Sequence, residues 1–236
     1  MADQTITAKI YRFDPSIDAE PTYKTYEVPW KEYTTGLEVL HYINENFEEI
    51  GFDFSCRSSL CGRCSMLIDG RPFLSCSKAL DPGEHTFEPL KGFPVIKDLI
   101  VDHAHIMEKM YATKLSVQSV EPITTICDIP YDLYWNTLEP LNMCRECMMC
   151  YTVCPPLQDE NKWESFIGPA AMAQIAMRHL DPEDQYDRVG QAAFSGIFDC
   201  TLCSKCSAVC PASIPHVELF TLLQQEAEKA GLKPKA

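Results

Sequence analysis

The 236-residue sequence contains no run of eighteen or more apolar residues, so it offers no candidate transmembrane helix. Its first residues also lack the basic and apolar regions of a secretory signal. We therefore expect a chain that neither spans a membrane nor enters the secretory route by itself. With 46% hydrophobic and 23% charged residues it has an ordinary globular composition, and its length suits two domains.

Positive charge is also scarce. Twenty lysine and arginine residues stand against 34 aspartate and glutamate residues, which gives a formal net charge of -14. Such a surface repels phosphate backbones, so we expect no binding to nucleic acid.

Several catalytic motifs are missing as well. The sequence has no nucleophile elbow, no phosphate-binding glycine loop and no H-E-x-x-H helix. It therefore predicts no substrate-converting site in this chain. What it does have is thirteen cysteines without an export signal, a combination that indicates metal binding and not disulfides.

The first hundred residues predict a small sheet wrapped on a helix. Thr34 or Thr35 is suited to cap the helix, and Gly51 to end it. Asp69-Gly70 predicts a tight hairpin turn. The expected elements are strands at 6–10, 23–28, 66–68, 72–74 and 85–90, and a helix with Leu37, Leu40, Ile43, Phe47 and Ile50 on one face.

From Asp98 onward the pattern becomes mainly helical. Helices are expected at 98–110, from Pro169 onward and at 216–229. We place the domain boundary at 105, which gives an α+β chain with a mixed domain at 1–105 and a helical domain at 106–236.

The mixed domain contains the spacing C-x4-C-x2-C followed by a fourth cysteine, which is the plant-type arrangement for a 2Fe-2S cluster. The predicted ligands are Cys56, Cys61, Cys64 and Cys76. The loop at 56–64 is expected to turn backbone N–H groups toward the sulfurs, with Gly62 permitting a close approach and Cys76 placed on the second hairpin strand. Arg57 and Arg63 are either solvated or raise the cluster potential. A zinc site is the alternative.

The helical domain contains two copies of C-x2-C-x2-C-x3-C-P, the bacterial ferredoxin run. In two-cluster ferredoxins the fourth cysteine of each run binds the other run's cluster. One predicted 4Fe-4S set is therefore Cys144, Cys147, Cys150 and Cys210. The other set is Cys154, Cys200 and Cys206, with Cys203 as a possible fourth ligand. A paired zinc site is again the alternative.

A few further residues could be mistaken for ligands. Cys127 lies outside every run and is expected to be a small core residue. His103 and His105 are expected to cap or pack, and Met148 and Met149 to pack beside a cluster.

The order of these runs resembles the iron-sulfur subunit of succinate dehydrogenase and fumarate reductase, over nearly the whole chain. The stretches CRSSLCGRC at 56–64 and FIGPA at 166–170 are typical of that family. The resemblance implies a plant-type ferredoxin β-grasp domain followed by a helical ferredoxin domain. It also implies a relay in which the 2Fe-2S cluster faces a flavin, the 4Fe-4S cluster lies in the middle and the last cluster, usually 3Fe-4S, faces quinone.

The same resemblance implies partners and a location. The partners are an FAD-containing flavoprotein that interconverts fumarate and succinate, and a membrane anchor with quinone and haem b. The subunit would lie peripherally on the cytoplasmic face of a bacterial inner membrane. Overall resemblance favours fumarate reduction as the direction.

Two departures from the family bear on the third cluster. Most members have an apolar residue at the position of Cys203, so a 4Fe-4S cluster is chemically possible here, although we favour 3Fe-4S. Related succinate dehydrogenases carry a quinone-contacting tryptophan just after the position of Cys154, whereas this chain has PPLQ at 155–158 and its next tryptophan is Trp163. Pro155, Thr201 and the neighbours of Cys206 remain candidates for quinone contact.

Two other functions stay open. One is the iron-sulfur subunit of another flavin-linked oxidoreductase, of the glycolate oxidase or heterodisulfide reductase type. The other is a free-standing ferredoxin-like carrier, against which three clusters in one chain argue.

Overall fold

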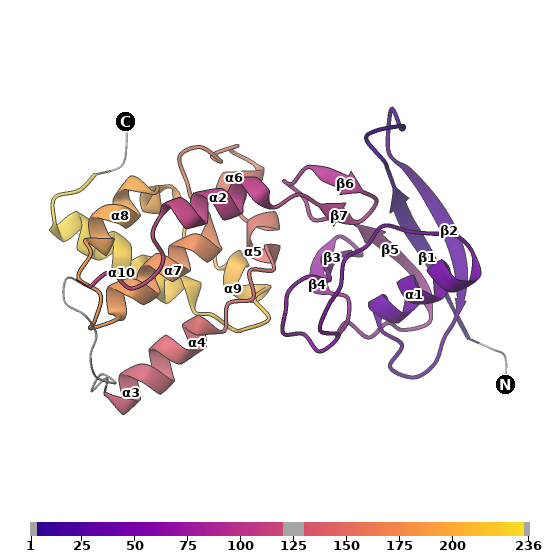
Figure 1. The fold of residues 1–236 in the computed structure, drawn as a ribbon, viewed down its shortest axis with the longest axis horizontal. Helices are drawn as coiled ribbons and strands as arrows, with labels where there is room; N and C mark the ends of the chain where they lie inside the picture. The colour runs from indigo at the N-terminus through magenta and orange to yellow at the C-terminus, as the bar shows by residue number, and fades with distance from the viewer. Residues whose placement is uncertain (1–3, 120–129, 234–236) are drawn as a thin grey trace. The chain divides into compact units, whose positions relative to one another are not determined.

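The computed structural model describes residues 4–119 and 130–233. The chain divides into two units (Figure 1). The first runs to His103 and also includes Arg145–Thr152, and the second comprises Ala104–Cys144 and the chain from Val153 onward. The eight residues from the second cysteine run therefore belong with the sheet, although they are far from it in sequence. The boundary at 105 stays a prediction.

The first unit is built on a five-stranded sheet in the order β2-β1-β5-β3-β4, with β1 and β5 parallel and the other neighbours antiparallel. The strands are β1 (Thr5–Arg12), β2 (Thr22–Pro29), β3 (Ser65–Ile68), β4 (Arg71–Leu74) and β5 (Gly83–Glu88). Helix α1 (Gly36–Asn46) packs its buried Val39, Leu40 and Ile43 into the same core as Ile6 and Phe87. The unit is completed by β6 (Val95–Lys97), β7 (Ile100–Val101) and α5 (Met149–Thr152).

Most of the expected elements of this unit are present. The strands at 6–10, 23–28, 66–68 and 72–74 are confirmed, and Thr35 caps α1 through its side chain. Asp69 and Gly70 both have positive φ, as the predicted turn requires. The last strand begins at Gly83 and ends at Glu88, before the expected end at residue 90.

The prediction for α1 was wrong at its end. The helix ends at Asn46. Phe47 is 54% exposed and is not part of the hydrophobic core. The side chain of Asn44 accepts a hydrogen bond from the Ile50 N–H at 2.8 Å, which turns the chain back so that Ile50 is buried without being helical. Gly51 therefore does not end the helix.

The prediction of a helix at 98–110 was also wrong for the first half of that range. Residues 95–101 form the hairpin of β6 and β7, and α2 begins at Ala104. Asp98 is 2% exposed and accepts hydrogen bonds from Arg12 Nε and from the N–H groups of Phe13 and Gly51. These partners are distant in sequence, so local periodicity did not reveal them.

The second unit is helical. It contains α2 (Ala104–Ala112), α3 (Tyr131–Leu133), the π-helix η1 (Tyr134–Leu138), α4 (Glu139–Asn142), α6 (Pro155–Gln158), α7 (Pro169–Leu180), α8 (Arg188–Phe194), the 3₁₀-helix η2 (Ile197–Asp199), α9 (Lys205–Ala208) and α10 (His216–Lys229). The helices expected from Pro169 and at 216–229 are confirmed. In α7, residues Pro169–Ala173 are almost fully buried.

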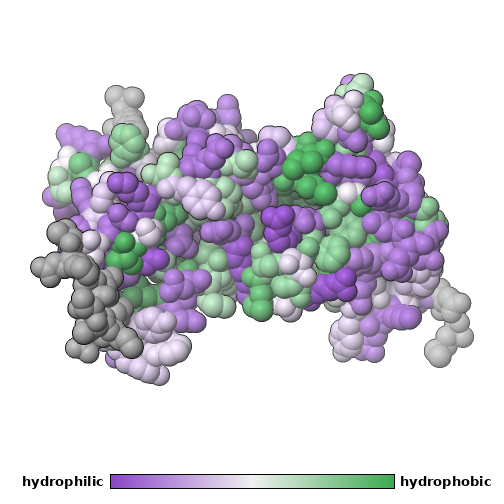
Figure 2. Space-filling view, viewed as in Figure 1, coloured by the Kyte–Doolittle hydropathy of each residue, from purple (hydrophilic) through white to green (hydrophobic). Residues whose placement is uncertain are grey.

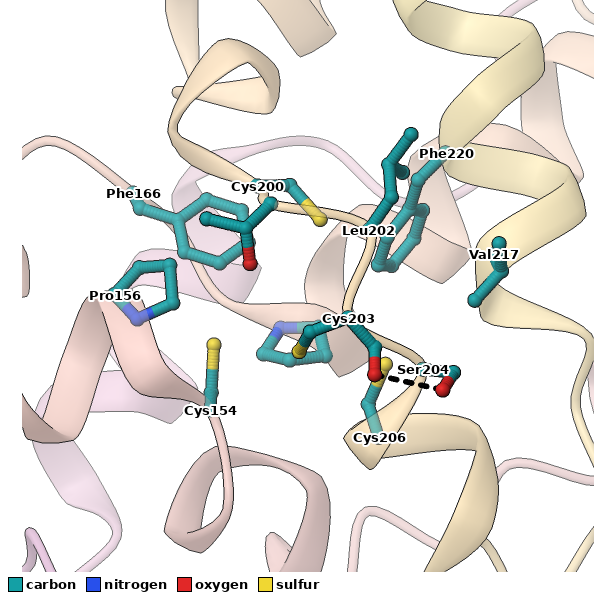
Figure 3. A pocket seen from close by; sticks show the side chains of 12 residues that line it. Cys154, Pro156, Phe166, Cys200, Leu202, Cys203, Ser204, Cys206, Val217 and Phe220 are labelled. Atoms are coloured by element: carbon teal, nitrogen blue, oxygen red, sulfur yellow. Dashed lines mark hydrogen bonds between the residues drawn. The ribbon is translucent and has the colours of Figure 1, made fainter.

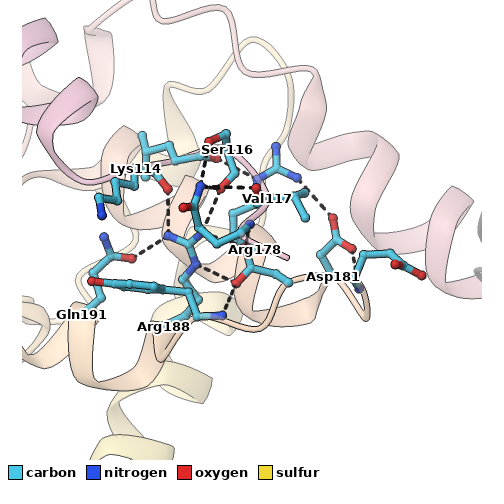
Figure 4. A network of polar contacts seen from close by, with 12 residues as sticks. Lys114, Ser116, Val117, Arg178, Asp181, Arg188 and Gln191 are labelled. Carbon is cyan, nitrogen blue, oxygen red and sulfur yellow. Dashed lines mark hydrogen bonds and ion pairs between the residues drawn. The ribbon is translucent and has the colours of Figure 1, made fainter. Parts of the chain in front are cut away.

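A buried ion pair joins this unit's helices to the segment that follows α2 (Figure 4). Arg188 and Asp184 are 1% and 0% exposed, and their Nη2 and Oδ2 atoms lie 2.7 Å apart. Arg188 also donates to the carbonyls of Lys114 and Ser116, while the N–H of Gln118 donates to Asp184. Burial raises the pKa of Asp184, but the hydrogen bonds from Arg188, Gln118 and Tyr186 bring the net pKa below its usual value. The segment 113–118 is thus fixed to α8.

Within the described ranges, no helix is both long and apolar enough to cross a membrane. Figure 2 shows polar and charged residues over most of the visible face, in line with the acidic composition, with smaller apolar areas between them.

Candidate iron-sulfur cluster sites

The first predicted site is a loop that presents backbone N–H groups to cysteine sulfur. The N–H groups of Ser58, Leu60 and Cys61 donate to Cys56 Sγ at 3.3–3.4 Å, and the Cys56 N–H donates to Cys61 Sγ. The first two of these bonds, from Ser58 and Leu60, contribute most to lowering the pKa of Cys56 to about 6. A loop of this kind stabilises thiolate, which is the form that binds iron.

The other two cysteines of this set lie beside each other. Burial raises the pKa of Cys64 to about 11, and the neighbouring Cys76 contributes to the shift. Ser59 Oγ lies 3.8 Å from Cys76 Sγ, so Cys76 also reaches the loop. It does so from the turn after β4 and not from the strand itself, because β4 ends at Leu74. The structure thereby brings together the residues of the predicted 2Fe-2S set.

The two arginines of this loop have local partners. Arg63 pairs with Asp53 at 2.5 Å, and the Arg57 guanidinium lies over the Phe54 ring at 5.0 Å. Leu60, at the tip of the loop, is 60% exposed. The loop is therefore held to its own unit by charge and ring contacts, with an apolar tip left at the surface.

The second predicted set is divided between the units. Cys147 and Cys150 belong to the first unit, and Cys144 and Cys210 to the second. Met148 and Met149 are 1% and 2% exposed, as expected for packing residues. His103 packs against Phe93, and His105 packs against Trp163. Cys127 lies outside the described residues.

The third predicted set surrounds one pocket of the second unit (Figure 3). Cys154, Cys200, Cys203 and Cys206 all line it, with apolar walls from Pro156, Phe166, Leu202, Val217 and Phe220. Thr201 is part of the lining and Pro155 is not. Burial raises the pKa of Cys154 to about 12 and that of Cys206 to about 11, and the neighbouring thiols add to both shifts. Thiols held this way release protons when a cation binds.

The two bacterial runs share a backbone pattern that the sequence did not reveal. In each run the residue before the second cysteine and the residue after it have positive φ: Glu146 and Met148 in one run, Leu202 and Ser204 in the other. Left-handed residues between right-handed ones aim successive N–H groups at one point and form an anion-binding concavity. Side chains of these types rarely adopt this conformation, so their composition gave no signal for it.

The chemistry of these donor sets fits iron-sulfur clusters. Sulfur ligands with converging N–H groups suit a cluster whose own sulfides carry negative charge. Within the described residues, no group of three or more histidine, cysteine, aspartate or glutamate side chains is arranged to hold a single metal ion.

Comparisons with known proteins agree with this chemistry. A family model described as "2Fe-2S iron-sulfur cluster binding domain" matches residues 7–108, and one described as "4Fe-4S dicluster domain" matches 140–214. The chain therefore carries domains for both cluster types, which favours iron-sulfur clusters over the zinc alternatives.

Similar proteins are found among fumarate reductases. The "Fumarate reductase iron-sulfur subunit" of Mycobacterium tuberculosis is 35% identical, with 89% of this chain and 87% of the relative covered. The protein of that name from Escherichia coli O6:H1 is 31% identical over 98% of both. A subunit of the "Fumarate reductase (CoM/CoB)" of Methanothermobacter marburgensis is 34% identical, but this chain spans 41% of its length.

A solved structure shares the fold. The match is to "Mycobacterium smegmatis Sdh1 complex in the apo form", with a TM-score of 0.88 and 23% identity over the whole of both chains. Taken with the extent of the sequence matches, this chain belongs to the family of fumarate reductase and succinate dehydrogenase iron-sulfur subunits.

Proposed function

We propose that this chain relays single electrons between a flavoprotein subunit and a quinone site in a membrane anchor. The observation that carries the proposal is the pocket formed by Cys154, Cys200, Cys203 and Cys206, in a chain that also has an N–H-lined Cys56 loop. Iron-sulfur clusters, when bound, accept and release one electron at a time. The chain's own part is to hold them in a fixed order and to exclude water from their sulfurs.

The proposed ligands follow the three sets. Cys56, Cys61, Cys64 and Cys76, in a β-grasp domain, hold 2Fe-2S. Cys144, Cys147, Cys150 and Cys210 hold 4Fe-4S. The third set, with Thr201 at its edge, faces quinone. The proposed setting is the cytoplasmic face of a bacterial inner membrane, beside an FAD-containing subunit and an anchor with haem b.

The physiological direction that we propose is fumarate reduction, because the relatives with high coverage carry that name. The test is to isolate the complex and measure both activities with its native quinone. Co-purification of a flavoprotein and a quinone-binding anchor, with fumarate reduction the faster activity, is the expected result. Isolation of the chain as a stable monomer without either partner would contradict the proposal.

A second candidate is suggested by the methanogen relative, whose name carries "CoM/CoB". It is the subunit of a flavin-linked oxidoreductase that uses a different electron donor, such as a pair of thiols. Fumarate reduction that runs on thiols and not on quinol would favour this candidate.

The number of irons in the third cluster depends on Cys203. Its side chain lines the pocket with the other three cysteines and is exposed, so it is both available as a ligand and open to solvent. We propose that the site holds 3Fe-4S with Cys154, Cys200 and Cys206 as its ligands. Cys203 lines the same pocket and is placed to serve as a fourth ligand if a 4Fe-4S cluster forms there.

Electron paramagnetic resonance tests this assignment, because an oxidised 3Fe-4S centre is paramagnetic and an oxidised low-potential 4Fe-4S centre is silent. Oxidised protein prepared without air is expected to show the 3Fe-4S signal, and the Cys203→Val variant should show the same signal. A wild type that lacks the signal until it is exposed to air, while Cys203→Val shows it from the start, would mean that Cys203 binds a fourth iron.

A further inference from the structure

Gly62 lies in the first cluster loop at a point where that loop touches the second cysteine run. Its φ is +71°. A Cβ atom added to Gly62 would lie 2.5 Å from the carbonyl oxygen of Arg145, 2.9 Å from Cys147 Cβ and 3.0 Å from Cys147 Cα. All three are backbone atoms or are bonded directly to the backbone, so no rotation of a side chain would make room.

Both sides of this contact are held in place. The segment that contains Cys147 is held by two contacts. The Thr152 hydroxyl donates to the Lys91 carbonyl at 3.2 Å, and the fully buried Tyr151 packs against Phe93 with ring centroids 6.3 Å apart. The cluster loop that contains Gly62 is held at its end, where the Ser75 N–H donates to the Cys64 carbonyl at 3.0 Å. A larger residue at 62 would have to move one of two anchored segments.

The residues that meet here are proposed ligands of different clusters or their direct neighbours. Gly62 is bonded to Cys61, a proposed ligand of the first cluster, and it touches Cys147, a proposed ligand of the second. A route from Cys61 through Gly62 to Cys147 thus contains one non-bonded contact and is otherwise covalent.

From this contact we infer that Gly62 is a positioning residue, which sets the gap between the first two clusters and provides the contact through which the electron passes. The inference rests on the proposed function. The step transfers one electron and no atom, so one cluster is oxidised as the other is reduced. The sequence predicts a close approach of Gly62 to its own cluster, and the structure adds this contact with the second cysteine run.

The chain supplies a matched control. Gly70 has a φ of +72°, and no atom lies within 4 Å of the Cβ it would acquire. Alanine at either position brings the strain of a left-handed residue. Alanine at 62 alone also forces the two loops apart.

The experiment compares wild type, Gly62→Ala and Gly70→Ala in the intact complex. Iron content and the magnetic interaction between the two reduced clusters are measured by electron paramagnetic resonance. In the wild type, the 2Fe-2S signal should relax faster once the second cluster is also reduced. In Gly62→Ala this interaction should weaken, and in Gly70→Ala it should stay as in the wild type.

Several outcomes would overturn the inference. One is equal interaction in Gly62→Ala and Gly70→Ala with iron retained. Another is no interaction in the wild type, whatever the variants do. Should Gly62→Ala fail to assemble, Gly70→Ala decides the cause: assembly of Gly70→Ala with a normal cluster interaction assigns the failure to the contact with Cys147, and failure of both variants would contradict the inference. A wild type without any iron-sulfur signal would instead contradict the proposed function itself.

Discussion

Replacing Arg188 by methionine is expected to speed hydrogen exchange of the backbone amides at 113–118 by more than about 100-fold. Removing one partner of a buried ion pair costs about 3–5 kcal/mol, because the other charge stays buried without compensation. Asp184 would keep its bonds from the N–H groups of Gln118 and Tyr186 but lose both from Arg188. The carbonyls of Lys114 and Ser116 would lose their donor as well.

Hydrogen exchange read by mass spectrometry suits this measurement because it reports local opening while the clusters remain bound. Each tenfold change in exchange corresponds to about 1.4 kcal/mol. The control is Arg178→Met, in which a 19% exposed arginine loses Asp181 and the Leu115 carbonyl. In Arg178→Met, hydrogen exchange of the amides at 113–118 should be about tenfold faster than in the wild type. If Arg178→Met and Arg188→Met increased the exchange rate equally, the burial of the Arg188–Asp184 pair would not be the cause of the effect.

Adding Asp184→Asn to Arg188→Met separates two effects: the loss of the hydrogen bonds from Arg188, and the buried negative charge of Asp184 that is left without a partner. Asparagine carries no charge, and its one carbonyl oxygen keeps one of the two backbone N–H groups that donate to different oxygens of Asp184. The double variant should therefore exchange more slowly than Arg188→Met alone. If the double variant opened further instead, the lost hydrogen bonds and not the charge would account for the effect.

Replacing Cys154 by alanine is expected to abolish quinone-linked activity. Cys154 is 8% exposed and lines the pocket of the third set, so its removal leaves an apolar wall where a ligand stood. The third-cluster signal should vanish from the paramagnetic resonance spectrum. The reduced 2Fe-2S signal should remain, because the Cys56 loop lies in the other unit.

The control for this prediction is Cys127→Ser, which changes the cysteine that belongs to no run. Its iron content and quinone-linked activity should match the wild type. If Cys154→Ala retained the full iron content, Cys154 would not be a ligand and the crossed assignment would fail.

Where the sequence prediction succeeded, the information was local. Cys56, Cys61 and Cys64 lie in one short loop, and the structure places Cys56 and Cys61 in hydrogen-bond contact there, as their spacing suggests. That these cysteines bind a cluster stays a prediction. The turn at Asp69-Gly70 and the helix at 216–229 were likewise set by neighbouring residues. The rest of the site depends on contacts across the chain.

Four features could not be read from the spacing of residues in the sequence. Ile50 is buried by a hydrogen bond from its own N–H to the Asn44 side chain, and Asp98 is fixed by Arg12, Phe13 and Gly51. The left-handed residues around Cys147 and Cys203 are not glycines, so composition gave no hint of them. Cys203 was identified as unusual, but its position in the pocket comes from the fold.

The segment Arg145–Thr152 belongs to the sheet unit, and this bears on how the protein is made. A nascent chain that has emerged as far as His103 contains every strand of the sheet and all four cysteines of the first set. It still lacks the residues that cover Gly62. That side of the loop is uncovered until residues 145–152 have also emerged from the ribosome, so the rate of translation sets the interval in which the first site is accessible from there.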